Sequence, residues 1–76
     1  MPLEIHNGIL KFTGYPKTGK LYSKESQILL VRASDVVNIR IDKGMHIVSF
    51  YDHSGMADRC IDAETFAGIQ DFLFNR

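Results

Sequence analysis

Cysteine is almost absent from this chain of 76 residues, because Cys60 is the only one. A lone thiol excludes an internal disulfide and is typical of proteins in a reducing compartment. No apolar segment approaches the roughly 18 residues of a membrane span. Residues 1–6 also lack the basic start and long apolar stretch of a secretion signal. We therefore expect a cytoplasmic protein with no membrane partner.

Net charge is absent as well, since nine Lys and Arg balance nine Asp and Glu. Residues 1–40 hold six basic and three acidic side chains, and residues 41–76 hold three basic and six acidic ones. The first part suits an anionic partner and the second would repel nucleic acid. Ordinary surface scatter accounts for such a difference equally well. Domains that rely on phosphate contacts are usually far more basic.

The length and a hydrophobic content of 45% predict a single globular domain, residues 1–76. A domain this small buries only about 60% of its unfolded surface. Such domains commonly gain stability from disulfides, a metal or oligomerisation. Because a disulfide is excluded and the metal signal is weak, self-association is the route that remains.

Branched apolar residues between turn residues predict an α+β fold. We expect a small, mainly antiparallel sheet of four to five strands and a C-terminal helix, with barrel-like closure as the alternative. Asp62 is the expected N-cap of that helix, and Glu64 places negative charge in its first turn. The expected strands are 8–13, 27–32, 36–41, 45–51 and 56–61, with a loop over 14–20 marked by Gly14, Pro16 and Gly19. A short first strand over 3–6 and the state of 21–26 are left open.

The clearest element is a hairpin that joins Val36–Ile41 to Met45–Tyr51. Asp42, Lys43 and Gly44 lie between the two strands and suit a type I turn. Gly44 would then take the positive φ of a bulge.

Two expected strands, 27–32 and 45–51, carry apolar residues on both faces. Successive side chains of a strand point to opposite sides, so Ile28 and Leu30 share one face while Leu29 and Val31 share the other. In the predicted helix, Phe72 and Phe74 lie about 160° apart around the axis. A chain of this length has little material to cover both faces of a sheet. A terminal helix, curling of the sheet on itself or a second chain must cover the other face, and we expect the second chain to do so. The predicted interface residues are Leu29, Val31, Val48, Phe50, Phe72 and Phe74.

This pattern predicts a non-enzymatic protein-binding module. It would act as a homodimer, or as a small subunit, regulator or inhibitor that covers a partner surface. The alternative is a small nucleic-acid-binding protein, because lysines that alternate with aromatic rings suit phosphates and unstacked bases. The residues of that possible contact are Tyr15, Lys17, Lys20, Tyr22 and Lys24.

Motifs for catalysis, metals and cofactors are incomplete, and we predict none of the three. Residues 14–20 match most of a phosphate-binding loop, but Leu21 stands where its Mg²⁺-binding hydroxyl belongs. Asp52, His53 and Ser54 are the residue types of a catalytic triad, yet neighbours in one turn cannot form the relay. The spacing of His46, His53, Asp52, Asp58 and Cys60 fits no standard zinc pattern.

Overall fold

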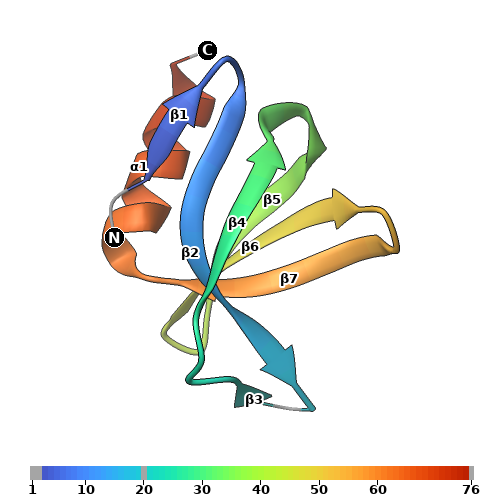
Figure 1. Cartoon of the computed structure of the whole chain (residues 1–76). Helices are drawn as coiled ribbons and strands as arrows, with labels where there is room; N and C mark the ends of the chain where they lie inside the picture. The colour runs from blue at the N-terminus through green and yellow to red at the C-terminus, as the bar shows by residue number, and fades with distance from the viewer. Residues whose placement is uncertain (1–2, 20, 76) are drawn as a thin grey trace.

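A curled antiparallel sheet with one helix beside it forms the protein in a computed structural model, which describes residues 3–19 and 21–75 (Figure 1). The sheet order is β1-β2-β7-β6-β5, and β3 and β4 also pair with β2. The predicted α+β fold is therefore confirmed, with the sheet curled into a half-barrel. The elements are β1 (Glu4–His6), β2 (Ile9–Thr18), β3 (Leu21–Tyr22), β4 (Gln27–Arg32), the 3₁₀ helix η1 (Ala33–Asp35), β5 (Val36–Asp42), β6 (Met45–Asp52), β7 (Gly55–Ile61) and α1 (Ala63–Phe74).

Strand β2 is long and changes its partner strand along its length. Its first part pairs with β4 as far as Gly14, which lies opposite Gln27. Its next two residues, Tyr15 and Pro16, pair instead with β7. The predicted loop over 14–20 is thus wrong as far as Thr18. A glycine within a strand marks a close backbone approach as readily as a turn, and the sequence pattern did not separate these two meanings.

The β5–β6 hairpin has the predicted strands but a tighter turn. Asp42 pairs with Met45, so the loop contains only Lys43 and Gly44. Their φ angles are 54° and 80°. Two consecutive positive φ angles are typical of a type I′ turn, whose twist matches that of the flanking strands. The positive φ of Gly44 is confirmed, whereas the type I turn beginning at Asp42 is wrong.

Helix α1 begins at the predicted cap. The backbone N–H of Thr65 donates to Asp62 Oδ1 over 2.6 Å. This hydrogen bond is the main reason that the pKa of Asp62 lies below its usual value. Ile69 of the helix belongs to the core and is fully buried. On a neighbouring side, a Cβ added to Gly68 would lie 3.0 Å from Leu3 Cδ2, so the start of the described chain lies against the helix.

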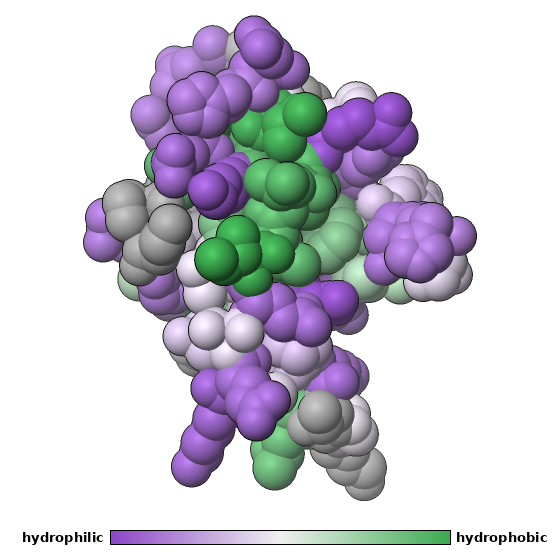
Figure 2. All heavy atoms as spheres, viewed as in Figure 1, coloured by the Kyte–Doolittle hydropathy of each residue, from purple (hydrophilic) through white to green (hydrophobic). Residues whose placement is uncertain are grey.

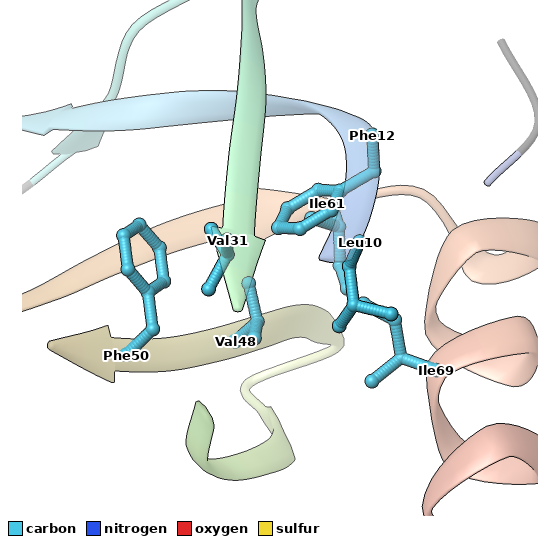
Figure 3. Close-up of a cluster of buried hydrophobic side chains, with 7 residues drawn as sticks. All are labelled: Leu10, Phe12, Val31, Val48, Phe50, Ile61 and Ile69. Atoms are coloured by element: carbon cyan, nitrogen blue, oxygen red, sulfur yellow. The ribbon is translucent and has the colours of Figure 1, made fainter. Parts of the chain in front are cut away.

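Seven apolar side chains form the core between the inner face of the sheet and α1 (Figure 3). None of them is more than 5% exposed. They are Leu10, Phe12, Val31, Val48, Phe50, Ile61 and Ile69.

The core includes three residues that the sequence pattern assigned to an interface. Val31, Val48 and Phe50 are buried within the chain, and Leu29 is half-buried against them. The assignment of Val31, Val48 and Phe50 to a contact with a second chain is therefore wrong, whereas that of Leu29 stays a prediction. The curl of the sheet brings its own inner faces together, so these side chains need no partner chain. The uncovered face of β4 is the one that carries Ile28 and Leu30.

Candidate interaction surface

The outer face of β4 presents two large apolar side chains to solvent. Ile28 is 64% exposed and Leu30 is 70% exposed. Leu30 lies opposite Lys11 of β2, and this register makes Ile9 its diagonal neighbour. Ile9 is itself 41% exposed. We call Ile9, Ile28 and Leu30 the β4 strip. Figure 2 shows hydrophobic residues gathered in the region of β4 with hydrophilic residues on both sides.

Among residues 3–19 and 21–75, one edge of β4 has no partner strand, because β4 pairs only with β2. The backbone N–H of Ala33 donates to Gly8 O over 2.7 Å, continuing that ladder by one residue. Backbone groups of an antiparallel strand alternate in direction, so those of Ile28, Leu30 and Arg32 point away from β2. The open edge thus presents backbone donors and acceptors beside the exposed apolar side chains.

A pocket of about 430 Å³ lies next to this edge. Leu30, Val31 and Arg32 line one side, and Phe50 and Tyr51 at the end of β6 line another. At the same place Arg32 Nε donates to Asp35 Oδ2 over 2.9 Å. The pocket therefore combines an apolar floor, an open strand edge and an exposed ion pair. Such a surface suits a polypeptide better than a small polar substrate.

A second apolar groove, of about 340 Å³, lies between α1 and β5. Phe66, Leu73, Phe74 and Ile39 contribute to its lining. Phe74 is 80% exposed. Phe72 is half-buried and packs against the core. The two rings thus differ in burial, and their role as contact residues stays a prediction.

The predicted basic-aromatic residues lie partly on β2 and β3. Lys17 pairs with Tyr22, and Tyr15 pairs with Cys60 of β7. Lys17 and Lys24 are exposed, Tyr15 and Tyr22 are half-buried, and Lys20 lies outside the described residues. Burial is the main cause that raises the pKa of Tyr22, and the charge of Asp58 adds to it. The aromatic rings are thus partly occupied in packing, and an acidic side chain lies nearby.

A polar row that sequence reasoning missed crosses β5, β6 and β7. Ser49, only 3% exposed, donates its hydroxyl to Asp58 Oδ1 over 2.5 Å. Arg40 Nη1 donates to Ser49 Oγ over 2.7 Å and to Asn38 Oδ1 over 3.1 Å. The strand register could have revealed the row, because Asn38, Ser49 and Asp58 are cross-strand neighbours. Since these groups satisfy one another, the row stabilises the sheet and offers no free reactive group.

The residues considered for metal binding and catalysis do not converge. In the described ranges, no three His, Cys, Asp or Glu side chains are placed to hold a metal ion. The ring of His46 packs edge-on against Phe66 at 5.0 Å. Asp52 Oδ1 accepts hydrogen bonds from both the hydroxyl and the backbone N–H of Ser54, each over 2.8 Å, and these bonds lower its pKa. Cys60 is half-buried, and burial raises the pKa of its thiol.

Among the residues that the structure describes, α1 is the only α-helix, and it is too short to cross a bilayer. Comparisons with protein-family models, curated proteins and solved structures found no match to this chain. The candidate surface is therefore defined by its geometry and chemistry.

Proposed function

We propose that this protein is a non-enzymatic protein-binding module and that β4 is its binding surface. The observation that supports this proposal most strongly is the coincidence, on one strand, of an open backbone edge with the exposed side chains of Ile28 and Leu30. Strand addition uses such an edge: main-chain hydrogen bonds hold the added strand, and alternate side chains give specificity.

The energetic reason is the cost of leaving this surface in water. A fully buried Ile or Leu gains roughly 1.5–3 kcal/mol relative to exposure. At 64% and 70% exposure, Ile28 and Leu30 forgo a large part of that gain. A single exposed leucine is ordinary, whereas a contiguous apolar strip marks an interaction site. The strip also lies on an edge that natural sheets usually protect with charge, proline or a bulge.

Photo-crosslinking tests this proposal. A benzophenone-bearing phenylalanine is placed at position 30 in the full chain, which is then irradiated in an extract of cells that produce the protein. Position 56 is the matched control, because Met56 is apolar and 63% exposed but belongs to β7. We expect protein adducts from position 30 and none above background from position 56. Equal labelling from both positions, or no labelling from position 30, would contradict the proposal.

Single-stranded nucleic acid is the second candidate partner. Its support is the pairing of Lys17 with Tyr22 across β2 and β3, which places a cation beside an aromatic ring. It ranks lower because Arg40, a further cation on the sheet, is held by Ser49 and Asp58. Fluorescence anisotropy with labelled single strands at physiological salt tests this candidate.

A further inference from the structure

We propose that the partner of β4 is a second copy of this chain, and that two β4 strands pair antiparallel through their open edges. The two half-barrels would then share one continuous sheet. This inference rests on the proposed function, since it uses the same strand and names what binds there.

Strand β4 is the least protected edge of the described sheet, since β1 at one end of the strand order has only three residues. Its register with β2 is regular over all six residues, and Gln27 to Val31 contains neither charge nor proline. The edge of β5 is interrupted by a register shift between Val36 and Asn38. Bulges and charges protect edges from pairing, whereas a flat apolar edge invites it. Strand β3, with two residues, is too short to compete.

The alternation of backbone groups limits how two copies can pair. Outward-directed residues must face outward-directed residues, which here are Ile28, Leu30 and Arg32. A two-fold axis at Leu29 satisfies this condition and places Ile28 of each copy opposite Leu30 of the other. An axis at Leu30 satisfies it as well but sets Ile28 opposite the charged Arg32. The first register is the one we propose, because it gathers four exposed apolar side chains into one cluster.

Charge favours the antiparallel direction. Glu25 precedes the strand and Arg32 ends it, and both are exposed. Arg32 already pairs with Asp35 through Nε over 2.9 Å, so Glu25 of the other copy would join this ion pair. Antiparallel pairing brings Glu25 of one copy next to Arg32 of the other, whereas parallel pairing would align like charges. The chain has no net charge, so two copies do not repel each other at long range. Because isologous contacts use one patch twice, the assembly closes at two copies.

Sedimentation equilibrium from low to high micromolar concentration tests the assembly. We expect the mass to rise from 8.6 kDa towards twice that value. Leu30→Ala removes apolar surface from the interface and should weaken association by about tenfold. Leu30→Pro also removes an N–H that points away from β2, so it should abolish association while the β2–β4 ladder persists. Circular dichroism verifies that both variants fold. Equal association of the two variants would overturn the edge pairing.

Disulfide trapping tests the register. This test does not depend on whether Leu30→Pro folds. In a Cys60→Ala background, Ile28→Cys with Leu30→Cys should form a covalent dimer on oxidation, because opposed residues lie within disulfide reach. Either cysteine alone should stay monomeric on a non-reducing gel. A dimer from Leu30→Cys alone would overturn the proposed register.

The two proposals fail in distinguishable ways. A strictly monomeric wild type, or a mass above two copies, overturns the β4–β4 dimer. If the wild type is monomeric while position 30, unlike position 56, gives one adduct of defined mass that excess unlabelled chain competes away, the binding surface stands and only the identity of its partner is wrong.

Discussion

Gly14 lies directly against Leu29: a Cβ added to Gly14 would be 2.8 Å from Leu29 Cδ1. The same Cβ would lie 3.1 Å from Arg59 Cβ, where β2 changes its partner strand. The leucine methyl can move aside, but the Cβ of a strand residue cannot move without its backbone. Gly14 is therefore required by crowding between two strands and not by an unusual φ angle.

We predict that Gly14→Ala lowers the free energy of unfolding by about 1–3 kcal/mol, as overpacking commonly does. Urea unfolding measures the change. The double variant Gly14→Ala with Leu29→Ala separates the two contacts, since it removes the leucine methyl and leaves Arg59 in place. We expect the two substitutions to be non-additive. Fully additive effects would show that Leu29 does not restrict position 14.

The cap of α1 predicts a pH dependence of stability. The folded-state pKa of Asp62 is lowered, chiefly by the Thr65 N–H, from a usual value of 3.8. The contribution of Asp62 is therefore complete above that value and is lost as the pH falls through the lower, folded pKa. We expect Asp62→Ala to cost about 1 kcal/mol at neutral pH. In thermal unfolding the difference from wild type should shrink at acidic pH.

The control is Asp62→Asn, whose side-chain oxygen can still accept the Thr65 hydrogen bond but does not titrate. It should retain most of the stability at neutral pH and show no acid-dependent part. A difference between wild type and Asp62→Ala that stays constant with falling pH would contradict the role of the carboxylate.

The β5–β6 turn predicts opposite effects at neighbouring positions. Gly44→Val places a β-branched residue at a φ of 80°, which should cost roughly 1 kcal/mol or more. Lys43 already holds a positive φ of 54°, so Lys43→Asn should raise the melting temperature slightly. Calorimetry measures both variants. A destabilised Lys43→Asn protein, or an unchanged Gly44→Val protein, would show that the turn differs from type I′.

The two phenylalanines near the end of α1 should differ in their effect on folding. Phe72 packs against the core, so Phe72→Ser should cost roughly 2 kcal/mol. Phe74 is 80% exposed, so Phe74→Ser should leave urea unfolding unchanged. It should also leave the β4 dimer intact, because Phe74 lines the separate groove beside β5. Weakened association of Phe74→Ser would instead place the helix end in the interface, as the sequence alone predicts.

For nucleic acid, we expect no detectable binding of the wild type to single-stranded DNA or RNA at physiological salt, measured by fluorescence anisotropy. If binding occurs, joint replacement of Lys17, Lys20 and Lys24 by Gln should weaken it. The salt slope should fall by about 0.7 for each phosphate of the single strand that the variant no longer neutralises. Clear binding that this triple variant abolishes would make nucleic acid the leading partner.

Much of the fold could be predicted because several elements carry a strong local signal. The strand over 27–32, the hairpin around Lys43 and Gly44, and the cap at Asp62 all follow from short-range patterns. The candidate surface could be predicted only in part. Ile28-Leu29-Leu30-Val31 is apolar on both faces. The pattern therefore shows that one face stays outside the core, but it does not show which face. That choice depends on Leu10 and Phe12, which β2 brings from far along the chain.

Two other features escaped the sequence pattern for the same long-range reason. Gly14 resembles a turn residue until β4 and β7 are placed on either side of it. The hydrogen bond between Ser49 and Asp58 depends on the register of a second hairpin. Neither relationship is contained in a window of neighbouring residues, and both require knowledge of which strands pair.

The span of the core along the chain also determines when this protein can fold during its synthesis. Its members extend from Leu10 to Ile69, and Ile61 and Ile69 complete the enclosure of Leu10. A nascent chain whose Ile69 has not yet left the ribosome therefore leaves the early strands uncovered. Pairing of β2 with β7 also requires that Arg59 and Cys60 have been synthesised. Folding of the complete core is thus delayed until the segment up to Ile69 has left the ribosome.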